Sequence, residues 1–251
     1  MESKPLISII TITFNASATL LPTLESIWSQ TFRDFEHVII DGASTDDTLA
    51  LARAYPDVRI LSEKDRGLYD AMNKGMRLAQ GKYLLFLNAG DALHAPDTLQ
   101  LYADAIMDND YPGIVYGQTD IVDAGRRRIA PRHLQAPASL TLASFAEGMV
   151  VCHQAFVALR RITDSYDTRW RFSADFEWCI RCLQHSRRNV LVPRVTADYL
   201  AEGATTANRR RSLMERFRIM CYYYGTLPTV GRHIGFVWRA LIHRGGSPRN
   251  S

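Results

Sequence analysis

The sequence is poor in cysteine and has no long apolar run. Four cysteines in 251 residues are too few for a disulfide-stapled miniprotein. No stretch reaches the roughly 18 consecutive apolar residues that a membrane-spanning helix needs. No secretory signal peptide is visible before the first apolar segment. These absences predict a cytoplasmic protein with reduced thiols.

Two common phosphate-binding signatures are also missing. No G-x-G-x-x-G follows the first apolar segment, and no G-x-x-x-x-G-K-[ST] occurs anywhere in the chain. Dinucleotide oxidoreductases and P-loop enzymes carry such glycine-rich loops because backbone N–H groups must approach the phosphates closely. Both enzyme classes are therefore disfavoured.

Charge is nearly balanced over the whole chain but not at its end. There are 30 Lys and Arg against 26 Asp and Glu, a formal net charge of +4. Residues 208–251 hold nine arginines and a single acid, Glu215. This segment predicts either contact with an anionic membrane surface or a helix packed on the domain with its basic face in water. No nucleic-acid-binding motif is present, so no nucleic-acid partner is expected. The apolar stripe inside the basic segment comprises Phe236, Val237, Ala240 and Leu241.

Apolar runs and helical periodicities alternate through the first part of the chain. Short runs rich in β-branched residues predict buried strands at 6–13, 37–40, 58–61 and 83–87. Apolar residues at helical spacing predict the helices between them. This order predicts an α/β fold with a mostly parallel central sheet flanked by helices. The second half is less regular, with strands expected at 114–117, 150–159 and 190–195, a helix at 172–182, and a C-terminal helical extension.

Polar residues follow each predicted strand of the first half. Asn15, Asp41 and the segments 63–66 and 88–91 all stand where a strand ends. Ligands of such sheets bind just outside the carboxyl ends of the strands. Carboxylates there can hydrogen-bond a base or a ribose, or hold a hard cation through oxygen. We therefore expect a ligand site at this edge of the sheet.

Three of these segments resemble a known family. They are 9–15 (IITITFN), 41–46 (DGASTD) and 86–91 (FLNAGD), and their order and spacing over residues 5–100 look like glycosyltransferase family 2. The resemblance implies the GT-A fold and inverting transfer of a sugar from a nucleotide sugar. The segment 62–75 (SEKDRGLYDAMNKG) is similar to bacterial members that build surface polysaccharides.

The resemblance also implies how the chain is divided. Residues 1–112 would form the nucleotide-sugar-binding half of one domain. Residues 113–207 would form its acceptor-binding and catalytic half, and residues 208–251 a basic helical tail.

By the same resemblance, six residues belong to the donor site. Asp41 would accept a hydrogen bond from the base, and Arg66 would lie near the base or the phosphates. Asp41 before Gly42 is also typical of a simple turn, and Arg66 of a solvated loop. Ser44 and Thr45 are expected to cap the following helix. The six residues are Thr13, Phe14, Asn15, Asp41, Arg66 and Asn88.

The metal motif of the family is reduced in this chain. The family usually carries Asp-x-Asp-Asp, whereas this chain has Asn88-Ala89-Gly90-Asp91. The remaining acid, Asp91, is the expected ligand of a divalent cation, Mn²⁺ or Mg²⁺, that also binds diphosphate oxygens. Such a cation would neutralise charge on the departing nucleoside diphosphate. The alternative is a turn after a buried strand.

Asp175 stands where the family carries its catalytic carboxylate. An inverting displacement needs one general base, which takes the proton of the acceptor hydroxyl. Asp175 is the expected base, although an acid there is also typical of the first turn of a helix. Glu177, two residues on, would point elsewhere on the helix.

Two further motifs have ordinary alternatives. Cys179 and Cys182 match C-x-x-C spacing, but Cys179 shares a helical face with apolar residues, so core packing is favoured over redox or metal chemistry. His153 and Gln154 could face the acceptor or the sugar, or lie at an ordinary strand end.

The expected function is an inverting glycosyltransferase at or near the inner face of the cell membrane. It would move one sugar from a nucleotide donor, with a UDP-sugar favoured, to a glycan or lipid-linked acceptor in envelope polysaccharide synthesis. The absence of a Gln-x-x-Arg-Trp sequence disfavours a processive synthase. Two alternatives stay open: a sugar nucleotidyltransferase, and a catalytically degenerate nucleotide-sugar-binding partner, against which Asp175 argues.

Overall fold

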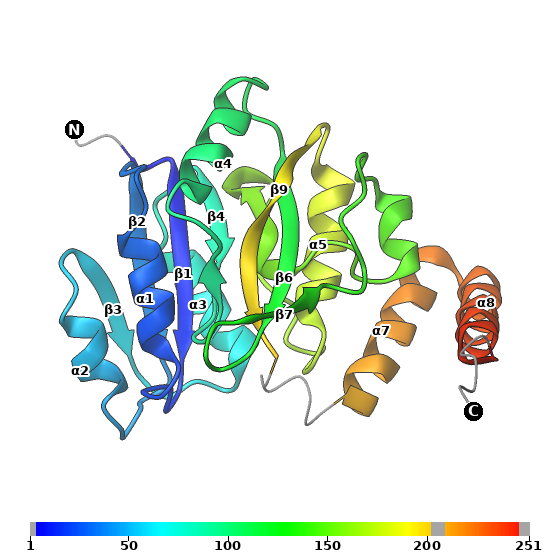
Figure 1. Ribbon diagram of the computed structural model, residues 1–251, viewed down its shortest axis with the longest axis horizontal. Coiled ribbons are helices and arrows are strands. Elements are labelled where there is room, and N and C mark those ends of the chain that lie inside the picture. The colour runs from blue at the N-terminus through cyan, green and yellow to red at the C-terminus, as the bar shows by residue number, and fades with distance from the viewer. Residues whose placement is uncertain (1–3, 202–208, 246–251) are drawn as a thin grey trace, which may run out of the picture.

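The computed structural model describes residues 4–201 and 209–245, with side chains for all of these except Arg209 and residues 236–245. The described strands form one nine-stranded sheet in the order β3-β2-β1-β4-β8-β6-β9-β5, with β7 paired to β6. Helices cover both faces of this sheet (Figure 1). The predicted α/β architecture is therefore confirmed.

The first half of the chain is the parallel part of the sheet. β1 pairs in parallel with β2 and β4, and β2 pairs in parallel with β3. Every residue of β1 and β4 is buried. Strands buried on both faces carry continuous apolar runs, which is why the sequence located them. Its elements are β1 (Ile7–Thr13), α1 (Leu20–Trp28), β2 (Phe35–Asp41), α2 (Thr48–Arg53), β3 (Val58–Ser62), α3 (Leu68–Leu78) and β4 (Tyr83–Phe86).

The second half extends the sheet in mixed directions. β8 is antiparallel to both β4 and β6, and β9 is parallel to β6. The predicted strand at 150–159 is wrong in its first part, because His153–Ala155 form a 3-10 turn, η2. No helix in the described part of the chain is both long and apolar enough to cross a membrane. The elements are β5 (Ala92–Leu93), α4 (Thr98–Met107), β6 (Ile114–Val122), β7 (Arg128–Pro131), η1 (Leu142–Glu147), β8 (Phe156–Leu159), η3 (Arg160–Ile162), α5 (Ala174–His185), β9 (Asn189–Leu200), α7 (Arg209–Tyr224) and α8 (Thr226–Gly245).

β1 divides its side chains between two cores. Ile7 and Ile9 lie in a buried cluster with residues of α1 and α4, on one face of the sheet. Ile10 and Ile12 lie in a second cluster with residues of α3 and α5, on the other face. This alternation follows from the two-residue period of a strand.

An aromatic cluster joins the two halves of the chain. The ring of Phe86 in β4 has centroid distances of 5.0 Å to His153, 5.3 Å to Tyr166 and 5.7 Å to Trp178. All four side chains are buried. The end of β4 is therefore held against η2 and α5, which brings the predicted base on α5 toward the donor half.

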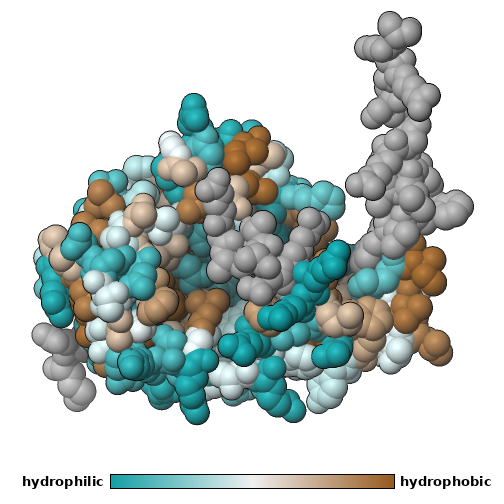
Figure 2. Space-filling view, turned by 90° about the horizontal axis from the view of Figure 1, so that it is seen from below, coloured by the Kyte–Doolittle hydropathy of each residue, from teal (hydrophilic) through white to brown (hydrophobic). Residues whose placement is uncertain are grey.

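The parallel strands β1, β2 and β4 end at one edge of the sheet, the lower edge in Figure 1. Viewed onto that edge, the surface is hollowed near its middle (Figure 2). Five of the six predicted donor-site residues lie in or just after these strands, and the sixth, Arg66, lies in the loop between β3 and α3.

Gly75 allows α3 to pack closely on β1. A Cβ added at Gly75 would collide with Cγ2 of Ile10.

We expect Gly75→Ala to lower the free energy of unfolding by about 1–3 kcal/mol through overpacking, measured by urea denaturation. Gly231→Ala is the matched control, because that exposed helical position has no atom within 4 Å of an added Cβ. Its unfolding free energy should rise by up to about 1 kcal/mol from helix propensity. A Gly75→Ala protein as stable as the wild type would contradict this packing.

Candidate functional site

Two loops at the carboxyl ends of β1 and β2 are joined into one surface. The amide oxygen of Asn15 accepts a hydrogen bond from the backbone N–H of Thr45 at 2.9 Å. The backbone N–H of Asn15 donates to Oγ of Ser44 at 2.8 Å. Asn15 has φ 47, and asparagine tolerates this left-handed conformation better than most residues. The predicted helix caps are wrong, since α2 begins after Asp47.

Asp41 is a fully buried anion at the end of β2. Its carboxylate accepts hydrogen bonds from Oγ1 of Thr13 at 3.0 Å, the N–H of Ser44 at 2.9 Å and Oγ of Ser62 at 2.7 Å. Burial alone would raise the pKa of Asp41, but the hydrogen bonds from Ser44, Ser62 and Thr13 outweigh it and leave the pKa below its usual value. The group is therefore ionised at neutral pH and rigidly held.

An aromatic ring and a carboxylate lie beside Gly42, the residue after Asp41, and Arg66 follows that carboxylate in the chain. Phe14 is 66% exposed. A Cβ added at Gly42 would lie 2.8 Å from Oδ2 of Asp65 and 3.2 Å from Cδ2 of Phe14, so the two side chains meet over this glycine. The side chain of Arg66 is 90% exposed, with one contact of 3.5 Å to Asp70. This surface can stack on a planar base and leaves the Arg66 guanidinium accessible to a phosphate.

The Asn88–Asp91 segment follows β4. The amide oxygen of Asn88 is buried and has no hydrogen-bond partner. A buried acceptor without a partner is unfavourable, so Asn88 is an exception to the general pairing of buried polar atoms.

Asp91 ties three segments together. Its Oδ1 accepts the N–H of Leu200 at 3.0 Å, and its Oδ2 accepts Nε2 of Gln154 at 2.6 Å. Its backbone carbonyl accepts Oγ1 of Thr23 at 2.7 Å. Asp91 is 5% exposed, and burial raises the pKa of its carboxyl to about 7.

These contacts do not fit the predicted metal role of Asp91. Both of its oxygens already accept N–H donors, and burial disfavours its anionic form. Gly90 has φ +100, and a Cβ there would lie 2.9 Å from Cδ2 of Leu200, so an acid at this position would be strained and would displace the Leu200 side chain. The described residues contain no group of three His, Cys, Asp or Glu that could hold a metal ion. Asp91 is a structural tether in this arrangement.

Asp175 lies in the first turn of α5 and is partly exposed. Its Oδ1 accepts a hydrogen bond of 2.9 Å from the hydroxyl of Tyr69, which lies at the start of α3. Tyr69 is 6% exposed and stacks on Tyr166 with a centroid distance of 5.6 Å. Tyr69 thereby links the predicted base to the helix that follows the Arg66 loop.

Glu177 points elsewhere, as expected. It accepts hydrogen bonds from Arg181 at 2.9 Å and from the Tyr223 hydroxyl at 2.5 Å. The sequence alone did not single out Tyr69 as a partner of Asp175. A phenol three residues after Arg66, on the helix that opens there, was the available signal.

The remaining motifs are part of the core. Burial lowers the pKa of His153 to about 4, and its Nε2 lies 2.7 Å from the Tyr166 hydroxyl, so it is a buried neutral histidine. Burial raises the pKa of the Cys179 and Cys182 thiols, which confirms their packing role. Gln154 faces Asp91, so it does not stand free for an acceptor.

Comparison with known proteins agrees with this geometry. The family model described as glycosyl transferase family 2 matches residues 8–165. A "PGL/p-HBAD biosynthesis glycosyltransferase" of Mycobacterium tuberculosis is 36% identical over 191 residues, which cover 73% of this chain and 72% of the relative.

Solved structures show the same fold at low sequence identity. Staphylococcus aureus TarS 1–349, in complex with UDP-GlcNAc, superposes with a TM-score of 0.68 at 16% identity, covering 92% of this chain and 73% of that one. The mannosyltransferase PcManGT of Pyrobaculum calidifontis, in complex with GDP-Man and Mn²⁺, gives a TM-score of 0.60 at 16% identity, covering 97% and 80%. With the family match over most of the sheet and polar residues gathered at the ends of β1, β2 and β4, the chain belongs to glycosyl transferase family 2 and is a nucleotide-sugar glycosyltransferase of the GT-A fold.

Proposed function

We propose that this protein transfers one sugar, with inversion, from a UDP-sugar to a glycan or lipid-linked acceptor of the cell envelope. The observation that carries the proposal is the tethering of Asp175 by Tyr69, which fixes a partly exposed carboxylate beside the loop that bears Arg66. The M. tuberculosis relative named for glycolipid biosynthesis and the UDP-GlcNAc complex of TarS support the acceptor and donor classes.

The donor would bind along the ends of β1, β2 and β4. Its base would stack near Phe14 and meet the buried carboxylate network of Asp41, which Thr13 and Asn15 help to hold. The unpartnered amide oxygen of Asn88 would accept a ribose hydroxyl. These assignments use five of the six predicted donor residues, and the sixth, Arg66, would lie near the phosphates.

The reaction is a single displacement. The acceptor oxygen forms a bond to the anomeric carbon while the bond from that carbon to the β-phosphate oxygen breaks, and its electron pair leaves with the nucleoside diphosphate. Asp175 takes the hydroxyl proton of the acceptor. Tyr69 acts through Asp175 as a positioning residue, since its hydroxyl fixes one carboxylate oxygen and leaves the other for the proton.

A divalent cation fits poorly at Asp91, because both carboxylate oxygens of Asp91 already accept hydrogen bonds from N–H groups. The Mn²⁺ in the PcManGT structure belongs to that protein and shows what the fold can accommodate.

We also propose that the C-terminal helices α7 and α8 contact a membrane surface. Leu227 and Ile234 on α8 and Tyr222 on α7 are 86%, 65% and 78% exposed, and Arg232 on α8 is partly exposed and pairs with Glu147 at 3.6 Å. Apolar side chains gather at this end of the molecule in Figure 2. Exposed apolar residues beside arginine suit an anionic bilayer surface. The predicted stripe from Phe236 to Leu241 lies outside the described side chains.

Replacing Asp175 tests the base. Asp175→Asn keeps the shape but cannot accept the proton, so kcat for sugar transfer or donor hydrolysis should fall about 10²- to 10⁴-fold. UDP binding, measured by calorimetry, should be unchanged. Asp164→Asn makes the same chemical change at a 70% exposed carboxylate and should leave kcat unchanged. Full activity in Asp175→Asn would place the base elsewhere, and UDP binding without turnover in the wild type would favour a degenerate binding protein.

Replacing Tyr69 tests the positioning role. Tyr69→Phe removes only the hydroxyl, and the stacked ring stays. Loss of one hydrogen bond to a charged group should lower kcat by about 10- to 100-fold, with the KM for the donor unchanged. Tyr224→Phe is the control, because it removes a hydroxyl that bonds the carbonyl of Leu142 away from the site. A rise in donor KM at constant kcat would contradict the positioning role.

A further inference from the structure

The β6–β7 hairpin brings an arginine to the segment that follows β4. Nη1 of Arg126 donates a hydrogen bond of 2.7 Å to the carbonyl oxygen of Gly90. The hairpin is the green ribbon that reaches the lower edge of the sheet in Figure 1. The hydrogen bonds from Leu200 and Gln154 lower the pKa of Asp91, and the positive charge of Arg126 lowers it further. A fixed guanidinium thus stands where the reduced metal motif lies.

The hairpin is built in a way that aims this side chain. The β6–β7 register shifts between Ile121 and Val122, and such bulges redirect strands next to functional sites. Arg126 itself has φ 64, a conformation that is unfavourable for a residue other than glycine. The tip is closed by Asp123, whose carboxylate accepts the backbone N–H of Arg127 at 2.9 Å and whose own N–H donates to the Arg127 carbonyl at 3.0 Å, and an alanine at position 127 keeps both bonds. The strain and the closed tip together turn Arg126 back toward Gly90.

The guanidinium keeps donors for another partner. Its described contacts are the Gly90 carbonyl and Asp198 at 3.7 Å, while a guanidinium has five N–H donors. Its side chain is 26% exposed. Arginine binds phosphate oxygens in pairs and stays charged at any working pH.

We propose that Arg126, and not a divalent cation on Asp91, supplies the positive charge that stabilises the departing nucleoside diphosphate. This inference rests on the proposed function and deepens it. The electron pair of the broken C–O bond moves onto the β-phosphate oxygen, and Arg126 offsets the charge that develops there. A preorganised cation at this place would serve as electrostatic stabilisation of the transition state.

The test measures release of UDP from UDP-sugars by the full chain, with and without the chelator EDTA. We expect EDTA to leave wild-type turnover unchanged. Arg126→Ala should lose about 100- to 1000-fold in kcat, and Arg126→Lys should recover part of it. Arg127→Ala, which removes the same charge from the same hairpin tip, should keep wild-type turnover. Circular dichroism and thermal unfolding show whether each variant is folded.

Three results would overturn this inference. They are wild-type turnover abolished by EDTA and restored by Mn²⁺, wild-type turnover in a folded Arg126→Ala, and equal losses in Arg126→Ala and Arg127→Ala. Each of these leaves the proposed function standing. Wild-type protein that binds no UDP-sugar would instead sink the proposed function itself.

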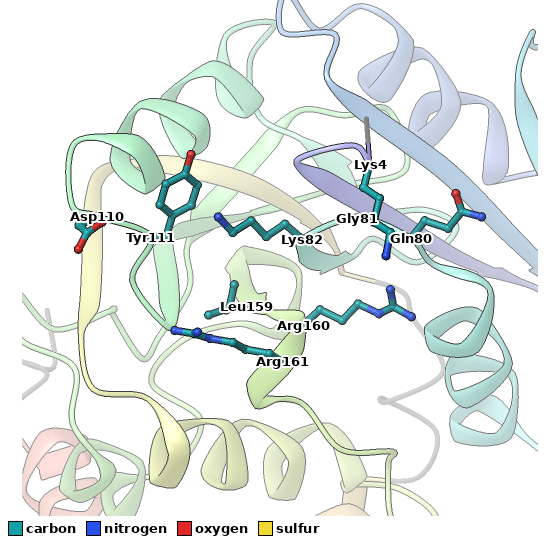
Figure 3. A pocket seen from close by; sticks show the side chains of 9 residues that line it. All are labelled: Lys4, Gln80, Gly81, Lys82, Asp110, Tyr111, Leu159, Arg160 and Arg161. Carbon is teal, nitrogen blue, oxygen red and sulfur yellow. The ribbon is translucent and has the colours of Figure 1, made fainter. Parts of the chain in front are cut away.

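A second, independent inference concerns the opposite edge of the sheet. A cavity of about 820 Å³ lies where β1 and β4 begin and β8 ends, and Figure 3 shows the side chains that line it. Arg160 extends toward Lys4 and Gln80, and Arg161 extends toward the side of Asp110 and Tyr111 (Figure 3). An adjoining cavity of about 560 Å³ shares Arg161 and Tyr111 and adds Arg187 and Arg188. We call the two cavities the basic groove.

The cations of the basic groove lack carboxylate partners. Within the described part of the chain, no carboxylate lies within 4.0 Å of any of them. Among the described residues, Asp110 is the one carboxylate that lines the two cavities, so the six cations leave the concavity with a positive potential that attracts anions. The six cations are Lys4, Lys82, Arg160, Arg161, Arg187 and Arg188.

One wall of the basic groove is strained. Asp110 and Tyr111 have φ 53 and φ 55, two successive left-handed residues of which neither is glycine. This conformation is unfavourable for a bulky residue such as tyrosine, and such strain gathers at binding sites. In this conformation the centroid of the Tyr111 ring lies 3.1 Å from Nζ of Lys82.

We infer that the basic groove binds a soluble anion that carries two or more phosphoryl groups. The charges line a concavity, which a compact anion can enter and a planar bilayer cannot follow. The groove lies at the edge opposite the donor site, so it would hold such an anion while the donor site is occupied.

Calorimetric titration with tripolyphosphate, in the presence of excess UDP, tests this inference. Wild type should bind, and Arg161→Ala or Lys82→Ala should bind about tenfold more weakly, as expected for one lost charge-assisted hydrogen bond. Arg53→Ala removes an exposed charge on α2 and should bind like wild type. Absence of binding, or equal binding by all variants, would overturn the inference. So would binding to phosphatidylglycerol vesicles that Arg161→Ala abolishes, because it would make the partner a bilayer.

Discussion

The buried carboxylate of Asp91 is the interaction on which the shape of the site depends. It fastens the end of β4 to the end of β9 through Leu200 and to η2 through Gln154, while its backbone holds α1 through Thr23. These segments come from distant parts of the chain. Removing one acceptor would leave buried N–H donors unpaired, which is costly in a dry interior. The geometry of Asn88 and Gly90 therefore depends on the buried carboxylate of Asp91.

This tether changes how the reduced metal motif is understood. The family motif has three acids in four positions, and this chain keeps only Asp91, so the segment can be described as a weakened metal site. Here the retained acid serves the fold, and Leu200 fills the space where a side chain at position 90 would project. The motif has lost two acids, and the guanidinium of Arg126, from the β6–β7 hairpin, lies against its Gly90. Because Arg126 lies far away in the sequence, only the folded structure brings the two together.

The sequence predicts the first half of the fold well for a physical reason. Parallel strands buried on both faces leave apolar runs, so the predictions at 6–13 and 83–87 fall within one residue of β1 and β4. The mixed half leaves weaker signals. β9 extends to Leu200 past Pro193 and Arg194, with register shifts against β6, and the sequence predicted only its first part. The short β5 has no periodicity to detect.

The site is predicted in part. The donor residues lie at strand ends, where the topology places them, and their roles remain predictions. The links that hold them, such as Tyr69 to Asp175 and Gln154 to Asp91, join residues 106 and 63 positions apart, and no local pattern signals such contacts.

A crystal structure of the protein soaked with UDP and Mn²⁺, recorded with anomalous scattering at the manganese edge, tests the central claim most directly. The structure predicts the uracil beside Phe14 and Asp41, the diphosphate within hydrogen-bond distance of Arg126, and no anomalous peak at Asp91. UDP bound away from the ends of β1, β2 and β4, or a manganese peak on the carboxylate of Asp91, would contradict it.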